Sequence, residues 1–304
     1  MLRDIPPDIL DDALRAVLAP PGASNASRAA LRTFRDYLAA MNVRCGGVYD
    51  PDLGPQSSAV AVRLPGRSAV ALVPFGDPAR YAKSLEALLA QLRASELVFV
   101  QALIEPDASG KAAALNRAGF RRITQMIYLE RDATYPWVDP PAPHAVWIPY
   151  APATHARFRT VIERSYIDSA DCPELTTLRT TDDAIASHAV AGVSGSEHWE
   201  LLSIDGLDAG ALLLSTIAGP RAIEVTYMGL VPELRGRRLG GMLLQRALQR
   251  ARALSARLVT IVVDERNTKA HALYERFGFR AVAARDAYLL ACQNDAPRAA
   301  QSCG

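Results

Sequence analysis

The chain has 304 residues, half of them hydrophobic, which is enough for two domains of about 150 residues each. A formal net charge of only +2, without a dense run of Lys and Arg, excludes the electrostatic signature of nucleic-acid or anionic-membrane binding. The amino terminus has no apolar signal core, and no stretch of about 18 residues is uninterruptedly apolar, so we expect a cytoplasmic protein that acts on a small molecule or a peptide.

The first half of the chain, 1–135, shares short motifs with the second half. Leu72-Val73-Pro74 returns as Leu230-Val231-Pro232, Gly119-Phe120 as Gly278-Phe279, and Tyr128-Leu129 as Tyr288-Leu289, at separations of 158, 159 and 160 residues. A separation this constant is typical of an internal repeat. We therefore expect each half to be one copy of the same fold.

Proline marks the boundary between the two copies. Residues 136–143 contain four prolines, and proline lacks the amide hydrogen that a helix interior or a central strand needs. Residues 136–144 are therefore the expected linker. After residue 292 the chain becomes polar, small and aperiodic, so 293–304 is expected to be a disordered tail.

The second copy, 145–292, shows a pattern of alternating strands and helices. Strands are expected at 145–149, 199–204, 210–217, 222–230 and 258–263, with helices at 153–164 and 181–190. Apolar residues at helical spacing between 239 and 254 predict an amphipathic helix. A shorter helix at 268–276 is expected to end at Gly278, and a last strand follows to residue 290. The predicted fold class is α/β with a mixed sheet.

The stretch 230–241, Leu-Val-Pro-Glu-Leu-Arg-Gly-Arg-Arg-Leu-Gly-Gly, joins a strand to this amphipathic helix. A helix start offers unpaired amides and the positive end of the helix dipole, and glycines let an anion approach the backbone closely. The pattern favours a pyrophosphate site, although an ordinary polar turn would also fit these residues.

A second motif, Asn267-Thr268-Lys269-Ala270-His271-Ala272-Leu273-Tyr274, follows the strand at 258–263 and precedes Gly278-Phe279. Together the two motifs resemble the GNAT superfamily of N-acetyltransferases over residues 145–292. The resemblance implies two tandem GNAT-like domains, each a mixed, mostly antiparallel twisted sheet flanked by helices. Leu230 and Arg238 depart from the usual family residues. A tandem chain with an active second half resembles the mycothiol synthase type within this family.

The resemblance implies that acetyl-CoA is the co-substrate. The amides of the loop would hold its pyrophosphate, the strand end would pair with the pantetheine arm, and the second motif would contact the arm from the other side. The cofactor-binding residues implied are Leu230, Val231, Arg235, Gly236, Arg237, Arg238, Leu239, Gly240, Gly241, Asn267 and Ala270. No metal is expected, because neither the five histidines nor the four scattered cysteines form a metal-binding spacing.

Two residues are the expected catalytic groups. An attacking amine must be neutral, so a carboxylate or a water that it orients usually removes the proton. By the resemblance, Glu224 would be this base, and Tyr274 would be the acid that protonates the departing thiolate. Glu224 would equally suit a solvated strand face, and Tyr274 would equally suit the core.

The loop at 166–175 is expected to form one wall of the acceptor pocket. Asp168, Asp171 and Glu174 would receive a cationic substrate and Cys172 would line the pocket, although acids near helix ends are commonly caps or solvated charges. We expect transfer of an acetyl group to a small-molecule primary amine by direct attack. Two alternatives stay open: a non-catalytic acyl-CoA-binding regulatory module, and transfer to a protein or peptide.

The first copy lacks these chemical positions. By the repeat, Glu224 falls on Gly66, Arg235 on Asp77, Gly236 on Pro78, Gly240 on Ala82 and Tyr274 on Leu115. An aspartate would repel a phosphate, and proline offers no amide to bind one. The first half is therefore expected to be a degenerate copy without a cofactor loop, which shapes the substrate cleft or stabilises the second half.

Overall fold

The computed structural model describes the chain except for residues 20–23, 42, 75–76, 135–144, 218–220 and 293–304. The expected linker at 136–144 and the expected tail at 293–304 lie outside the described residues. Among the described helices, none has both the length and the apolar character that crossing a bilayer requires.

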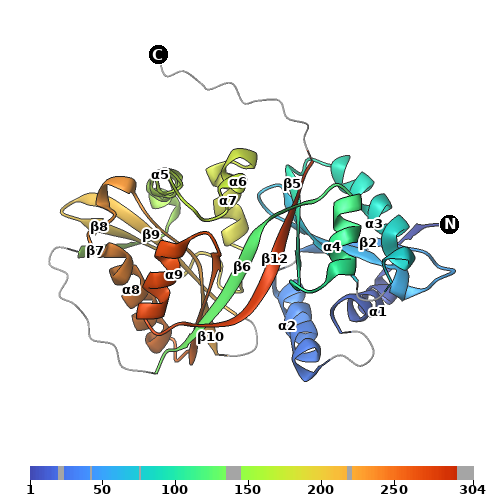
Figure 1. Cartoon of the computed structure of the whole chain (residues 1–304). Coiled ribbons are helices and arrows are strands. Elements are labelled where there is room, and N and C mark those ends of the chain that lie inside the picture. The colour runs from blue at the N-terminus through green and yellow to red at the C-terminus, as the bar shows by residue number, and fades with distance from the viewer. Residues whose placement is uncertain (20–23, 42, 75–76, 135–144, 218–220, 293–304) are drawn as a thin grey trace, which may run out of the picture.

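Both halves follow one order of elements, as the repeat predicted, apart from the additional short helix α6 in the second half (Figure 1). The first half contains β1 (Arg3–Asp4), α1 (Pro7–Leu18), α2 (Asn25–Met41), β2 (Arg44–Tyr49), β3 (Ala59–Leu64), β4 (Ser68–Leu72), α3 (Pro78–Arg93), β5 (Phe99–Ile104), α4 (Ser109–Arg117) and β6 (Arg121–Asp132). The second half contains β7 (Ala145–Pro149), α5 (His155–Ser165), α6 (Pro173–Leu178), α7 (Thr181–His188), β8 (Glu200–Ile204), β9 (Leu207–Thr216), β10 (Ala222–Leu230), α8 (Leu239–Ala253), β11 (Leu258–Asp264), α9 (Thr268–Arg276) and β12 (Arg280–Ala291). The predicted α/β class with two tandem copies is confirmed.

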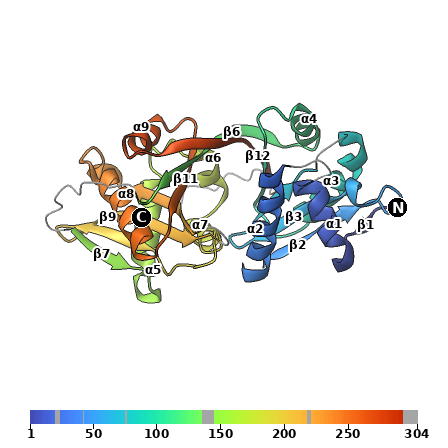
Figure 2. The same ribbon diagram turned by 90° about the horizontal axis from the view of Figure 1, so that it is seen from below.

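The strands join into one sheet that runs through both halves. The order of the described strands is β1-β2-β3-β4-β5-β12-β6-β11-β10-β9-β8-β7, and the pairs are antiparallel except β4 with β5 and β10 with β11. The last strand of each half therefore pairs with the other half: β6 lies against β11, and β12 lies against β5. Figure 2 shows β6 and β12 passing between the two halves. The sheet does not divide at the expected boundary between residues 135 and 145.

Hydrophobic cores lie on both faces of the sheet. In the second half, α8 and α9 cover one face, with Leu243, Leu244 and Leu248 buried at helical spacing, and α5 and α7 cover the other. The exchanged strands belong to these cores, since Leu129 of β6 packs in the core of the second half and Tyr288 of β12 packs in that of the first. Each half thus completes the core of the other.

A second contact joins the turn between β3 and β4 to helix α7. The guanidinium of Arg67 donates two hydrogen bonds to the Asp183 carboxylate, at 3.1 and 2.7 Å, and the hydroxyl of Ser187 donates to the carbonyl of Pro65 at 2.9 Å. At Gly66, which has a φ of +79°, an added Cβ would lie 2.0 Å from the carbonyl oxygen of Asp183. Only glycine fits so close to the helix.

Candidate active site

The parallel strands β10 and β11 separate before they end. They pair from Ala222 with Leu258 to Val225 with Ile261, and beyond that point the described residues of the two strands no longer pair with each other. The register of β10 against β9 shifts between Val225 and Tyr227, which is the pattern of a β-bulge. The bulge turns the end of β10 away from β11 and opens the sheet at their carboxyl ends.

The start of α8 lies directly after this opening. Gly236 and Arg238 have φ angles of +76° and +64°, and this reversal of the backbone brings the chain into the helix without a side-chain cap on its first turn. The amide of Gly241 donates to the carbonyl of Arg238 at 3.1 Å. No acceptor within the described part of the chain takes the amides of residues 237–240, so these donors are available to an anion.

The glycines at this helix start also permit close helix packing. A Cβ at Gly240 would lie 3.0 Å from Cδ2 of Leu273, and one at Gly241 would lie 3.2 Å from Cζ of Phe277. Both neighbours belong to the α9 segment. The sequence suggested a phosphate role for these glycines, and the structure adds a packing role. A large substitution at either position therefore changes the helix contact as well as the loop.

The three loop arginines differ in what they contact. The guanidinium of Arg235 donates to the carbonyls of Leu230 at 3.1 Å, Ile167 at 2.8 Å and Ser165 at 2.8 Å. It therefore fastens the end of β10 to the end of α5 and has few donors left for a phosphate. Arg237 and Arg238 are exposed, and neither side chain has a polar partner among the described residues.

The backbone of Val231 is already bonded within the protein. Its amide donates to the carbonyl of Ala209 at 3.0 Å, and its carbonyl accepts from the amide of Leu234 at 3.1 Å. Any pairing of an extended ligand with β10 must therefore involve residues before Val231. Asn267 caps α9, because its side-chain oxygen accepts from the amide of Ala270 at 3.2 Å.

A cavity of about 670 Å³ opens beside the separated strands. Its walls come from α5, the segment around α6, the start and end of α7, the bulge of β10, β11 and α9. The lining residues are Arg159, Glu163, Tyr166, Ile167, Asp171, Cys172, Leu175, Thr176, Arg179, Thr180, Thr181, His188, Val225, Thr226, Tyr227, Met228, Ile261, Val262 and Tyr274. A volume in this range is typical of small-molecule sites.

Glu224 lies on β10 one residue before the lining residue Val225. It is opposite Ser215 of β9 and Thr260 of β11, and its side chain is partly buried. Burial raises the pKa of Glu224 to about 7, because the ionised carboxylate loses solvation. A carboxylate with a pKa near neutrality suits a general base.

Tyr274 reaches the cavity from α9, on the opposite side of the opening from α6. It is 5% exposed, and its ring lies 6.0 Å from that of Phe279. Burial, and secondly the charge of Asp171, raise the pKa of Tyr274, so the phenol keeps its proton at neutral pH. Both the packing role and a position at the cavity are therefore observed for this residue.

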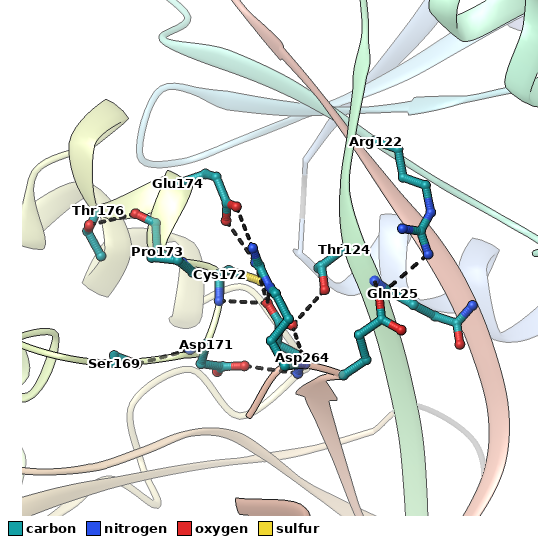
Figure 3. A network of polar contacts seen from close by, with 12 residues as sticks. Arg122, Thr124, Gln125, Ser169, Asp171, Cys172, Pro173, Glu174, Thr176 and Asp264 are labelled. Atoms are coloured by element: carbon teal, nitrogen blue, oxygen red, sulfur yellow. Dashed lines mark hydrogen bonds and ion pairs between the residues drawn. The ribbon is translucent and has the colours of Figure 1, made fainter. Parts of the chain in front are cut away.

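The predicted acceptor loop is held by a polar network around Asp264 (Figure 3). Asp264 is fully buried and accepts from the hydroxyl of Thr124 at 2.6 Å, from the amide of Cys172 at 3.0 Å and from the guanidinium of Arg266 at 2.7 Å. Burial would raise the pKa of Asp264, but the bonds from Arg266 and Thr124 outweigh it and bring the pKa to about 2. Thr124 belongs to β6, so the first half takes part in this network.

The four predicted substrate residues have different environments. Glu174 forms two hydrogen bonds with Arg266, at 2.6 and 2.9 Å, which commits its carboxylate to the network. Asp171 and Cys172 line the cavity, whereas Asp168 is exposed and is not among the lining residues. Burial, and then the charges of Asp171 and Asp264, raise the pKa of the Cys172 thiol, so it stays protonated.

Asp171, Cys172 and Asp264 bring potential metal ligands within 4.8 Å of one another. Their chemistry does not favour a metal. Both oxygens of Asp264 already accept from protein donors, and a protonated thiol is a poor ligand. The geometry instead fits a structural junction between the acceptor loop and β11.

Sequence reasoning missed several cavity residues that lie between α5 and α7. The Tyr227 hydroxyl is hydrogen-bonded to that of Ser165, and the Tyr227 ring lies 5.4 Å from the His188 ring. Burial, and then the charge of Arg179, lower the pKa of His188 to about 3, so the imidazole is neutral at pH 7. Tyr227 lies in the strand that the motif marked, but no spacing in the sequence connects it to His188.

In the described residues of the first copy, the corresponding helix start is capped. The corresponding helix, α3, begins at Pro78, and the Asp77 side chain caps it by accepting from the amide of Ala79 at 2.9 Å. A carboxylate therefore occupies the place that an anion would take. Leu115, at the position of Tyr274, is fully buried.

Comparison with known proteins identifies the kind of domain. Residues 168–279 match the family model described as "Acetyltransferase (GNAT) family", which supports acyl transfer from an acyl-CoA. No curated protein matches the chain in sequence.

Solved structures match nearly the whole chain. A GCN5-related N-acetyltransferase from Sphaerobacter thermophilus has a TM-score of 0.60 at 19% identity, covering 96% of each chain. A tandem GNAT protein from the clavulanic acid biosynthesis pathway has a TM-score of 0.56 at 15% identity, covering 97% of this chain and 100% of that one. A putative acetyltransferase from Pyrococcus horikoshii has a TM-score of 0.55 at 13% identity, covering 96% and 89%. These similarities confirm the tandem GNAT fold.

Proposed function

We propose that the second half of this chain, 145–292, transfers an acetyl group from acetyl-CoA to a primary amine of a small molecule. One observation carries the proposal: β10 separates from β11 beside the 670 Å³ cavity, and the uncapped start of α8 follows the end of β10. The amides of residues 237–240 would bind the pyrophosphate. The free backbone edge of β10 before Val231 would pair with the pantetheine arm, which directs the thioester to the cavity.

The proposed chemistry is direct attack. The amine nitrogen forms a bond to the thioester carbonyl carbon, and its proton passes to Glu224 through an intervening water, since Glu224 itself is not among the lining residues. When the carbon–sulfur bond breaks, Tyr274 donates its phenolic proton to the thiolate and later recovers a proton from solvent. The products are the acetylated amine and free CoA. The protonated Cys172 has no part as a nucleophile.

The first half is proposed to support the site without binding a cofactor. Its strand β6 supplies Thr124 to the network that holds the acceptor loop, and its β3–β4 turn contacts α7, which contributes to the cavity wall. The domain limits at 135 and 145 and the resemblance to mycothiol synthase stay predictions. The cavity volume of about 670 Å³ is in the range of small-molecule sites, which favours a small molecule over a peptide.

Calorimetric titration with acetyl-CoA tests the cofactor site. Gly236→Asp places a negative charge in the loop at a position where an added Cβ meets nothing within 4 Å and where φ is +76°. Gly206→Asp is the matched control, because Gly206 is equally open and has a φ of +82°. Aspartate tolerates such angles better than most residues.

We expect micromolar binding that Gly236→Asp weakens at least about 10-fold and Gly206→Asp leaves unchanged. Absence of binding to the unmodified protein, or equal losses in both variants, would contradict the proposed cofactor site. If the protein binds acetyl-CoA but releases no CoA with any amine, the non-catalytic binding module is the correct alternative.

A further inference from the structure

Arg179 is a cationic group in the cavity whose charge the protein does not neutralise. It follows α6 directly, is partly buried and lines the cavity. No carboxylate among the described residues lies within ion-pair distance of it. The other cavity arginine, Arg159, differs, because it pairs with Asp182 at 3.3 Å.

The groups around Arg179 leave its charge unmet. Its charge acts on His188 and on Tyr166, both of which line the cavity. His188 is neutral at pH 7, and burial raises the pKa of Tyr166, so neither provides an anion. Since Arg179 is only partly buried, its guanidinium stays charged in the cavity, where a ligand that brings an anion can pair with it.

The opposite charge lies near the proposed thioester position. One oxygen of Asp171 accepts from the amide of Asp264 at 3.0 Å, and the Asp171 charge acts on Tyr274. Glu163 of α5 is a further acid in the wall, and it is exposed. The cavity therefore holds both an acid, Asp171, and a cation, Arg179, and the charges of both act on Tyr166.

We propose that the acceptor is a primary amine that also carries an anionic group, a carboxylate or a phosphate, and that Arg179 binds this group. The amine then points toward Asp171 and Tyr274, where the acetyl group is transferred. This inference rests on the proposed acetyl transfer and adds the substrate class. A bidentate contact from arginine is well suited to both anions.

Three series of amines of graded chain length test the inference: aminoalkyl carboxylates, aminoalkyl phosphonates and the neutral amino alcohols. Release of CoA is measured with the unmodified protein, with Arg179→Gln and with Arg157→Gln. Arg157 is the control, because it pairs with Asp208 at 2.6 Å, outside the cofactor loop, and does not line the cavity. Binding of each amine to the CoA-loaded protein is measured in parallel by calorimetry.

We expect at least one anionic series to exceed the neutral series in kcat/KM. Arg179→Gln should raise the KM of that anionic series about 10- to 100-fold and leave the neutral series unaffected, and Arg157→Gln should change neither. If no amine is acetylated, the calorimetric affinities of the anionic and neutral amines, compared between the same variants, test the inference. The inference is overturned if anionic and neutral amines react equally well, or if Arg179→Gln weakens the anionic and the neutral series equally. It is also overturned if no anionic amine binds at about 10 mM. None of these results contradicts the cofactor site, which is tested separately by the titrations of the unmodified protein, Gly236→Asp and Gly206→Asp with acetyl-CoA.

Discussion

Glu224 offers a test in which stability and activity change in opposite directions. Burial raises its pKa from 4.5 to about 7, so the folded protein holds this proton more tightly than the unfolded chain does. Proton binding by Glu224 therefore stabilises the folded state; this contribution is complete below about pH 4.5 and is lost as pH rises through about 7. A shift of this size corresponds to at most about 3 kcal/mol of unfolding free energy, and partial solvation reduces it.

Replacing Glu224 with Gln removes the ionisable group and keeps the shape. Near pH 5 we expect the unfolding free energies of the variant and the unmodified protein to be similar. At about pH 8 the variant should be more stable by about 1–3 kcal/mol, because it avoids the buried carboxylate. Urea denaturation at several pH values measures the difference, and Glu275→Gln, at an exposed position on α9, is the control.

Activity should respond in the other direction. In the unmodified protein kcat/KM should rise with pH up to about 7 as the base ionises, and Glu224→Gln should abolish this limb and lower kcat about 100-fold or more. A stability difference that is the same at pH 5 and pH 8 would refute the burial argument. If Glu224→Gln keeps full activity and the same rise of kcat/KM with pH, another group is the general base.

Three further changes address other groups. Tyr274→Phe should lower kcat about 10- to 1,000-fold with little change in the Kd of acetyl-CoA. The control Tyr81→Phe, at a fully buried tyrosine of the first half, should leave kcat unchanged. Similar kinetics for the two variants would rule out the acid role of Tyr274. Cys172→Ser should retain activity. Iodoacetamide should inactivate the unmodified protein only slowly at pH 8, because burial raises the pKa of the Cys172 thiol. A loss of acetyl transfer in Cys172→Ser would indicate a covalent route through this thiol. Arg67→Ala should raise the acceptor KM without altering acetyl-CoA affinity. Arg157→Ala removes a similar two-bond pair with Asp208 and should leave the acceptor KM unchanged. Equal kinetics for the two variants would show that the β3–β4 turn does not position α7.

Local sequence patterns predicted the elements that carry the motifs. The expected strand at 222–230 and helix at 268–276 match β10 and α9 residue for residue, because alternation, an Asn cap and a Gly at the helix end are all local signals. Gly278 has the expected positive φ of +79°. The short helix α6 was not predicted, since six residues inside an acidic loop give no periodic pattern.

Contacts between distant residues could not be predicted in the same way. The charge of Arg235 indicated a phosphate, but the fold places three carbonyl oxygens around its guanidinium. The acid at Glu174 indicated a substrate contact, but it pairs with Arg266, which is 92 residues away in sequence. In both cases the charge of the residue indicated that its partner would be a group of opposite polarity, but only the tertiary structure shows which group it contacts.

The exchange of the last strands gives the first copy a structural role in the second half. The repeat gives β6 and β12 matching motifs, so the sequence alone does not decide which of the two lies beside β11. In the fold, β6 covers the edge of β11, buries Leu129 in the core under α8 and α9, and brings the Thr124 hydroxyl to Asp264. Without the first half, the strand on one side of the cavity would have an open edge and the acceptor loop would lose one of its supports. The first copy therefore contributes structure to the site of the second, which is a function that does not need a binding site of its own.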